Sequence, residues 1–585
     1  MIDPLLLVLS GVVVVALATV IGPRFNVAGP LVLLAIGAGV SLLPFVAPFS
    51  VNPEVILVGV LPPLLYSAAV QLPAIEFRRD FAPIAGLSVV LVVFSSLVLG
   101  LFFWAVIPGL GLALSIALGA ILSPTDAVAT SIAKRLGISP RVVTMLEGES
   151  LLNDATALVL LRTAVAAVAS GFAFGDALAD FAWAVVIALV LGAAIGWVNL
   201  RVRERVSNSA ANTALSFTIP FLAYLPTEHL GGSGLVAAVV AGIVTGQGAA
   251  RRFTPEQRIS DRLNWRTVEL ILEGGVFLVF GLELKDIVVA NLREHEGLWH
   301  GTWLALSALG IVLLVRALYV TGLIGLQARR SRRHPRHQDR IEGAQQRLDR
   351  FEEAYREAPE QFGERGADPA RTERRIGWMR SRIARTMADL DYYRDSPLTA
   401  RHGTVIVWAG MRGVVTLAAA QTLPEDPNIQ RPLLIFVAFL VALFSLVAQG
   451  LTLSAVVRTV GLSGEGGEGP SRDEQRALSA ELRDAAISAV QSGALARQNG
   501  EPFPADLIER AGARLVQPPN EDDDATARVR DLLELRLASI EAMRTRLDDL
   551  SRDGRFSTAA LRHALAELDA DQLSLELRID DGADG

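Results

Sequence analysis

The segment EGESLLNDATALVL, residues 147–160, is the most informative stretch of this sequence. It lies among long apolar runs but is rich in polar groups, which are Glu147, Glu149, Ser150, Asn153 and Asp154. At about 100° per residue, a helix places the last four on one arc of its surface, whereas Leu151 and Leu152 point to the other side. An ionised carboxylate at membrane depth is costly, so such groups face an interior or a wet cavity and usually carry function.

A purely structural reading is a buried acid that pairs with a base and locks two helices together. The number of polar groups in the segment favours a functional site for the cluster as a whole. Glu149 taken alone remains a candidate for a structural ion pair.

The composition indicates a membrane protein. The chain has 585 residues, of which 51% are hydrophobic and 20% charged, and its mean hydropathy is +0.40. It contains no cysteine, which excludes disulfides, thiolate nucleophiles and cysteine-based metal sites. The first apolar run, Leu5–Val20, has no basic residues before it, so we expect a retained membrane helix and not a removed signal peptide.

Stretches of roughly 17–25 mainly apolar residues predict about thirteen membrane-spanning helices. The predicted ranges are 4–22, 29–47, 54–72, 82–107, 110–133, 142–166, 178–200, 209–226, 232–250, 266–286, 300–326, 402–424 and 432–457. If the N-terminus lies outside, the inner loops hold most of the Arg and Lys residues. The outer loops then hold only Lys285, Arg293 and Arg431, with Arg162 at an outer helix end. This asymmetry predicts an outer N-terminus and a cytoplasmic C-terminus.

The resulting domain organisation has four parts. Residues 1–326 carry the first eleven membrane helices, residues 327–401 form a charged cytoplasmic loop, residues 402–457 carry the last two membrane helices, and residues 463–585 form a helical cytoplasmic tail. The arginines between Arg329 and Arg336 either bind anionic lipid headgroups or only anchor the topology. The tail is either regulatory or dimer-stabilising, or it is a soluble appendage.

A second polar feature is ILSPTDAVAT in the predicted helix 110–133. Pro124 should kink or break this helix, and Thr125 and Asp126 follow it directly. A break at membrane depth is tolerated where it lines a cavity or an ion site. Carboxylate, hydroxyl and freed carbonyl oxygens are the groups that a small hard cation needs in place of its hydration shell.

A third feature is WAGMRGVVTLAAA in the predicted helix 402–424, where Arg412 stands between Gly410 and Gly413. Glycines weaken a helix, so this is a second candidate for an interrupted span. Transporters built from inverted repeats place two broken helices at matching positions of their halves. Arg412 then either neutralises the dipole ends of the broken helices or pairs with a carboxylate.

Arg316 lies well inside the predicted helix 300–326, where an unpaired guanidinium would be very costly. It therefore requires an acid, and we expect Glu149 to be that acid. The pairing would leave Asp154 available to titrate.

Taken together, EGESLLND, SPTDAV, LVRALYVTG, GMRGVVTLA and the early LPPLLYSAAV resemble the cation:proton antiporters of the NhaP and eukaryotic sodium/proton exchanger type. The likeness covers roughly residues 1–457. It implies an all-α polytopic membrane protein of the cell membrane with inverted repeats and two crossing, interrupted helices. It also implies a homodimer in which a core bundle moves against a dimerisation scaffold.

The resemblance also implies roles for single residues. Asp154 becomes the shared carrier of cation and proton, and Ser150, Asp126 and the Thr125 backbone become ligands of the transported Na+. Asn153 becomes a neighbour that stabilises the site, and Glu149–Arg316 a structural ion pair. The Asn153-Asp154 sequence resembles the electroneutral branch of the family.

Two positions depart from many relatives. Ser67 stands where an acid follows the aromatic residue of LPPLLY, and Glu273 stands near a position that is often Asn. Both departures leave the choice of cation and the pH response open.

The predicted function is exchange of a monovalent cation, Na+ before Li+ or K+, for H+ by competition for Asp154. The ion gradient drives the flux; the sequence has no P-loop pattern, and neither enzymatic activity, a cofactor nor nucleic acid is expected. The expected partners are the transported cations and protons, membrane lipids and a second copy of the chain. A potassium/proton antiporter, a gated cation channel and a membrane ion sensor are the alternatives.

Overall fold

The computed structural model describes residues 4–25, 28–44, 46, 51–126, 128–170, 174–293, 297–331, 343, 345–354, 369–425 and 430–465, and short pieces of the chain between residues 484 and 575. These residues form helices and connecting turns, and no strand occurs among them. The chain divides into two compact units, residues 1–463 and 464–585. The helices predicted in the tail lie largely outside the described residues, as do most of the arginines between Arg329 and Arg336.

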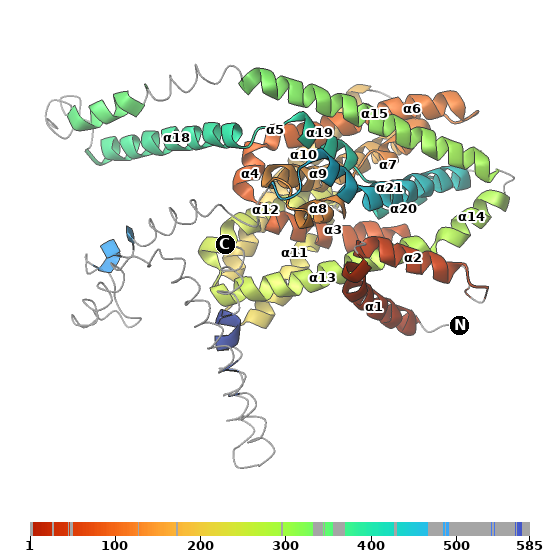
Figure 1. Ribbon diagram of the computed structural model, residues 1–585, viewed down its shortest axis with the longest axis horizontal. Coiled ribbons are helices and arrows are strands. Elements are labelled where there is room, and N and C mark those ends of the chain that lie inside the picture. Colours follow the sequence, from red (N-terminus) through yellow and green to blue (C-terminus); the bar gives the residue numbers. More distant parts are fainter. Residues whose placement is uncertain are drawn as a thin grey trace, which may run out of the picture. The chain divides into compact units, whose positions relative to one another are not determined.

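The first unit is built from long helices joined by short connections (Figure 1). Its elements are α1 (Pro4–Ile21), η1 (Gly22–Phe25), α2 (Gly29–Ser41), η2 (Val55–Val60), α3 (Leu61–Gln71), α4 (Ala74–Arg79), α5 (Phe81–Ala85), η3 (Gly86–Val90), α6 (Leu91–Val106), α7 (Leu112–Leu122), α8 (Val128–Arg135), α9 (Pro140–Ser170), α10 (Phe174–Arg203), α11 (Ser209–His229), α12 (Gly234–Arg252), α13 (Pro255–Leu282), α14 (Leu284–Arg293), α15 (Leu298–Ser331), α18 (Pro369–Asp395), α19 (Ala400–Trp408), α20 (Val414–Gln421) and α21 (Arg431–Val460).

Each of the thirteen predicted ranges contains helix, but two boundaries near α13 differ from the prediction. This helix begins at Pro255 and not at residue 266, because Thr254 and Gln257 form a capping box and the proline occupies the first helical position. The polar first turns of α13 escape a search for apolar stretches. Helix α14 is amphipathic, and no separate helix was predicted after residue 286.

Five helices of the described part are long and apolar enough to cross a membrane by length and composition. They are Phe81–Val106, Pro140–Val168, Ala179–Arg203, Leu298–Arg329 and Arg431–Val460. Five of the other predicted spans contain apolar helices that are shorter, namely Val8–Ile21, Gly29–Ser41, Val55–Gln71, Leu112–Leu122 and Gly234–Ala249. The number of membrane crossings therefore stays a prediction.

The two predicted interruptions are present. The first lies between α7, which ends at Leu122, and α8, which begins at Val128. The second lies between α19, which ends at Trp408, and α20, which begins at Val414. In each case two short helices with an extended stretch between them replace one continuous span.

The helices of the first unit pack as two groups. We call α1, α2, η2, α3, α10, α11, α12 and α13 the continuous group, because these helices pack mainly on one another. We call α5, η3, α6, α7, α8, α9, α15, α19, α20 and α21 the interrupted group, because it contains both broken helices. In Figure 1 the long helix α15 passes across α6 and α21, two of its neighbours in the interrupted group.

Glycines bring helices together inside each group. Gly242 and Gly246 of α12 lie against the backbone of α3, and Gly192 and Gly196 of α10 lie against the backbone of α12. A methyl group at any of the four would overlap the neighbouring helix, so these contacts fix the helix separations. The described glycines that approach the backbone of another helix do so within their own group.

The end of α18 contacts the interrupted group through a buried carboxylate. Asp80, between α4 and α5, is fully buried and accepts hydrogen bonds from Arg141 of α9 at 2.8–3.2 Å. The hydroxyl of Tyr392 on α18 donates to the same carboxylate at 2.8 Å. Nearby, Arg79 pairs with Asp389 of α18 at 2.6 Å. The charged loop is thus attached to the membrane helices where it returns to them.

Candidate functional site

The two helix interruptions meet. The backbone N–H of Asp126, in the first break, donates to the carbonyl of Met411, in the second, at 2.7 Å. Gly413 lies so close to the Asp126 carboxylate that a Cβ at this position would overlap it. Backbone pairing and the missing side chain together hold the two extended stretches side by side.

Arg412 interacts with carbonyl groups at the ends of the broken helices. Its guanidinium donates to the carbonyl of Leu122 at 3.1 Å and of Ser123 at 3.4 Å, at the C-terminus of α7, and to the carbonyl of Gly410. Unpaired carbonyls at a helix C-terminus carry partial negative charge. Of the two roles considered for Arg412, these contacts favour neutralisation of a helix end.

Behind the first break lies a buried polar network. Arg316 of α15 forms a two-pronged ion pair with Glu149 of α9, with Nη2 and Oε2 2.8 Å apart, and its Nε donates to the carbonyl of Ile406 in α19 at 3.0 Å. The Thr125 hydroxyl donates to Glu149 at 3.3 Å and accepts from the side-chain amide of Asn153 at 2.7 Å. The network ties α9, α15, α19 and the first break into one unit.

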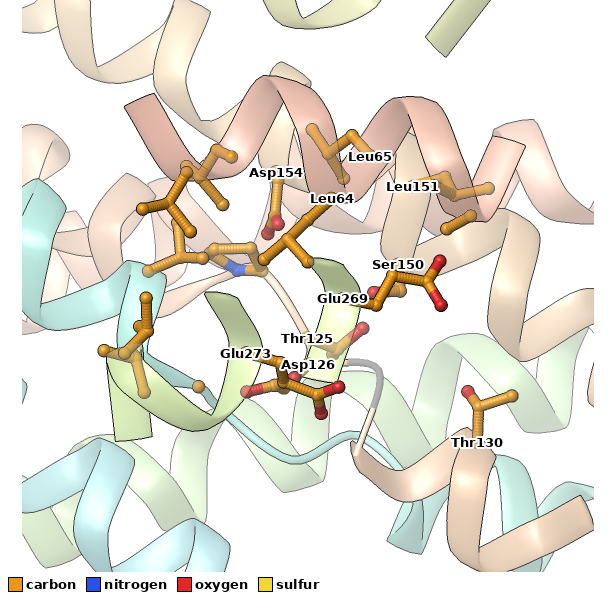
Figure 2. Close-up of a pocket in the computed structure, with 18 of the residues that line it drawn as sticks. Leu64, Leu65, Thr125, Asp126, Thr130, Ser150, Leu151, Asp154, Glu269 and Glu273 are labelled. Atoms are coloured by element: carbon orange, nitrogen blue, oxygen red, sulfur yellow. The ribbon is translucent and has the colours of Figure 1, made fainter. Parts of the chain in front are cut away.

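On the other side of the break is a cavity of about 330 Å³ (Figure 2). It lies between the two groups and is bounded by α3 and α13 of the continuous group and by α8, α9 and both breaks of the interrupted group. Its polar lining consists of Gln71, Thr125, Asp126, Thr130, Ser131, Lys134, Glu147, Ser150, Asp154, Glu269, Glu273 and Thr416. The remaining lining is mostly aliphatic.

Asp154 lies near the middle of α9, about 21 Å from the first residue of the helix at 1.5 Å per residue. It is 7% exposed, and its carboxylate points into the cavity in Figure 2. Among the described residues, no hydrogen bond or ion pair holds this carboxylate. Beyond it a small void of about 10 Å³ is lined otherwise only by apolar residues, among them Ile121, Leu158 and Leu161.

The cavity extends from Asp154 to one end of the helices. At that end it is lined by Gln71, at the end of α3, and by Lys134, at the end of α8. Lys134 is 57% exposed and pairs with Glu147. A small cation or a proton in water can reach a buried acid by this route.

The predicted site residues separate into two sets. Thr125, Asp126, Ser150 and Asp154 line the cavity. Glu149, Asn153, Arg316 and Arg412 are buried, and they are not part of its lining. The proposed ligands thus line the same cavity. The other four residues are buried, and their contacts can hold the ligands in position.

The sequence reading was wrong about Leu151, which was expected on the opposite side but lines the cavity next to Ser150. Glu273 lines it too, whereas Ser67 is buried and receives a weak hydrogen bond from Gln71 at 3.5 Å. Glu269 and Thr130 were missed. The spacing of Glu269 and Glu273, one turn apart on α13, is the signal that would have indicated a common face.

Two joined helix breaks beside a cavity that ends at a buried acid are the arrangement of a membrane carrier for small cations. The chain belongs to the family described as "Sodium/hydrogen exchanger, transmembrane", whose model matches residues 11–337 and 378–459. The predicted membership of the monovalent cation:proton antiporters is confirmed, and with it a multi-pass transporter of the cell membrane.

Two relatives and one solved structure illustrate the likeness. The chain is 28% identical over 568 residues to the "Uncharacterized Na(+)/H(+) exchanger YjcE" of Escherichia coli (strain K12), covering 93% of each chain. It is 32% identical over 276 residues to the "Sodium, potassium, lithium and rubidium/H(+) antiporter" of Bacillus pumilus (strain SAFR-032), covering 46% of this chain and 41% of the relative. The fold is similar to that of the sodium proton antiporter MjNhaP1 from Methanocaldococcus jannaschii, with a TM-score of 0.54 and 16% identity over 78% of this chain and 98% of the other.

Proposed function

We propose that this protein exchanges Na+ for H+ across the cell membrane and that both ions compete for Asp154. The observation that carries the proposal is the placement of this carboxylate. It is buried at mid-helix and lies on the wall of the cavity, and no hydrogen bond or ion pair holds it among the described residues, unlike the neighbouring Glu149. Ser150, Asp126 and the Thr125 backbone are the further proposed ligands of the cation, and Na+ and H+ are cargo and not resident cofactors.

Movement of the interrupted group against the continuous group would carry Asp154 between the two faces of the membrane. The surfaces that meet around the cavity are largely aliphatic, for example Leu64 and Leu65 on α3, Leu151 on α9 and Phe277 on α13. Such surfaces slide more easily than the glycine contacts inside each group, which fix helix against helix. A bare carboxylate is expensive to move through a low-dielectric barrier, so crossing requires that a cation or a proton neutralises it. This requirement couples the two fluxes.

The finer parts of the proposal follow from the sequence. The predicted topology has thirteen membrane crossings, inverted repeats and an outer N-terminus. It gives the cavity a cytoplasmic mouth, because Lys134 and the ends of α3 and α8 then lie on the cytoplasmic side. A single titrating carboxylate with Asn153 beside it favours one proton per cation, and hence electroneutral exchange. The continuous group is the expected dimerisation scaffold. Sodium export and control of internal pH and cation content are the expected roles in the cell.

The test is transport in proteoliposomes. With the membrane voltage held at zero, an outward Na+ gradient should drive H+ inward, and a pH-sensitive dye inside the vesicles should report it. Asp154→Asn should abolish the signal while the protein stays folded, and Glu204→Gln, a change at a half-exposed surface carboxylate, should not. Ion flux without proton counter-movement would favour a channel, and full exchange by Asp154→Asn would refute the proposed carrier.

Potassium is the second candidate for the cation, since the name of one relative includes potassium, lithium and rubidium. The same assay with K+, Li+ and Rb+ gradients separates the two. A larger pH response to K+ than to Na+ would make this a potassium/proton antiporter.

A further inference from the structure

Polar contacts at two places join the continuous and interrupted groups in the described part of the chain. The side-chain amide of Gln421, at the end of α20, donates to Oε2 of Glu283, directly after α13, at 2.7 Å. Arg162 of α9 pairs with Glu228 of α11. In each contact the continuous group supplies the acid.

Both contacts lie at the same end of the helices. Glu228, Glu283 and Gln421 occupy the C-terminal ends of α11, α13 and α20, and Arg162 lies in the C-terminal half of α9. The mouth of the cavity lies at the opposite end, where Lys134 pairs with Glu147 inside the interrupted group and Gln71 donates to Glu269 inside the continuous group at 2.9 Å. Each of these two pairs at the mouth thus lies within a single group. The two cross-group contacts therefore lie at the end opposite the mouth.

Glu283 is the better anchored of the two acids. It is 2% exposed, and its Oε1 accepts the backbone N–H of Val51 at 3.0 Å, so one oxygen is held by the segment before η2 and the other by Gln421. Gln421 is held in turn, because Arg431 donates to its backbone carbonyl at 2.6 Å. Removing Gln421 from Glu283 would leave a buried carboxylate oxygen without its donor, unless water enters.

Beside this contact is a second cavity of about 500 Å³, lined by Asn52, Glu283, Asp286, Gln421 and Arg431 among others. It offers room for water on the outer side of the contact. Separation of Gln421 from Glu283 would let water reach both groups and continue towards Asp154. The contact is thus placed where an opening on this side would have to begin.

We propose that Gln421–Glu283 and Arg162–Glu228 form a clasp that holds the two groups together while the cavity is open at the opposite end, and that both contacts break in each transport cycle. This inference rests on the proposed function, since it needs the groups to move against each other. Gln421–Glu283 contributes more than Arg162–Glu228, because Arg162 is 57% exposed and exposed ion pairs stabilise little.

The absence of cysteine from the sequence allows a direct test. In the double variant Glu283→Cys/Gln421→Cys, a short bifunctional thiol reagent should join the groups and lower the Na+/H+ exchange rate at least tenfold. The control is Glu204→Cys/Arg252→Cys, which replaces a 2.8 Å ion pair between neighbours within the continuous group. Its cross-linking should leave the exchange rate unchanged. Full exchange by cross-linked Glu283→Cys/Gln421→Cys protein would overturn the clasp, whereas absence of exchange in the unmodified protein would refute the proposed function instead.

A second variant keeps the clasp testable if the cysteine pair disturbs folding. Gln421→Leu removes the donor, so the closed end should open more often and the cavity less often. Ala68→Cys, on the exposed part of the cavity wall, reports this through its labelling rate with a membrane-impermeant thiol reagent added at the cavity mouth. We expect labelling to slow by roughly tenfold in the Gln421→Leu background, the effect of losing one hydrogen bond to a charged group. An unchanged labelling rate would contradict the proposal.

Discussion

Glu149 and Asp154 lie on the same helix, little more than one turn apart, and their surroundings differ. Both oxygens of Glu149 contact Arg316, and Thr125 adds a further donor. Asp154 faces a cavity instead. The sequence predicted this division from one argument, that a buried arginine needs an acid. It did not identify the hydrogen bonds of Thr125 and Asn153, because these depend on how an unwound stretch is oriented.

The Glu149–Arg316 pair should contribute strongly to stability. Arg316→Met leaves Glu149 buried without its counter-charge, and loss of one partner of a buried pair costs about 3–5 kcal/mol. We expect a clear fall in the midpoint of thermal unfolding in detergent. Arg458→Met, at an exposed arginine, is the control and should change the midpoint little. Equal effects of the two variants would contradict a structural role for the pair.

Gly413 should be needed for the joined breaks. In Gly413→Ala the new methyl group would overlap the Asp126 carboxylate, which must move, and the second break must move with it. We expect the exchange rate in proteoliposomes to fall at least tenfold, because a small displacement of the groups at a functional site can lower its rate by a large factor. Gly325→Ala in α15 meets no atom within 4 Å and serves as the control. Normal exchange by Gly413→Ala would mean that the close approach to Asp126 is dispensable.

At the scale of the helices, Pro124 and the pair Gly410 and Gly413 were sufficient to predict both interruptions. The polar start of α13 and the separate helix α14 were missed, because a search for long apolar stretches does not detect capped or amphipathic turns. The contacts of α18 with Asp80 were not predicted either. Nothing in the local sequence indicates that Tyr392, more than 300 residues away, donates to that carboxylate.

The contact between α18 and Asp80 should weaken at high pH. Burial, and then the negative charge of Asp80, raise the pKa of Tyr392 well above its ordinary value near 10, and burial raises the pKa of Tyr393 as well. The neutral tyrosine is therefore favoured when α18 is attached. The attachment is fully stable below about pH 10, the pKa of a free tyrosine, and is progressively lost above it. Limited proteolysis of residues 369–395 should accelerate above that pH and stay constant between pH 7 and 9.

Tyr392→Phe tests the same contact at neutral pH. The variant removes a hydrogen bond to a buried charged acceptor, which is worth about 1.5–3 kcal/mol. We expect faster cleavage of α18 at pH 7 than in the unmodified protein. Trp378→Phe, at an exposed position on the same helix, should not change the cleavage rate. Unchanged cleavage of Tyr392→Phe would show that the hydroxyl contributes nothing to the attachment.

For the whole molecule, hydropathy and the distribution of Arg and Lys predicted the order and approximate limits of the helices. They did not predict how the helices divide into two groups. That division depends on helix pairings such as the contact of Gly242 with the backbone of α3. The sequence of one helix alone does not indicate which other helix it packs against. A wet cavity beside the polar cluster was predicted, but the helices that bound it were not, since the cavity lies where the two groups meet.

The predicted orientation can be tested with single cysteines, since the parent sequence has none. Leu230→Cys, in the connection between α11 and α12, should react with an impermeant thiol reagent on intact cells. Ser463→Cys should react only after the membrane is opened, and the cysteine-free parent should not react at all. Both residues are exposed, so access and not burial decides the result. The reverse pattern would invert the assigned topology.

The network of Arg316, Glu149, Thr125 and Asn153 has a consequence for thermodynamics. It joins α9, the first break, α15 and α19, which all belong to the interrupted group. The proposed ligands would therefore move together and keep their arrangement during the movement. An ion would then meet the same ligands whichever compartment it came from. The two concentration ratios alone set the direction of net flow through such a carrier, so reversing them reverses the flow.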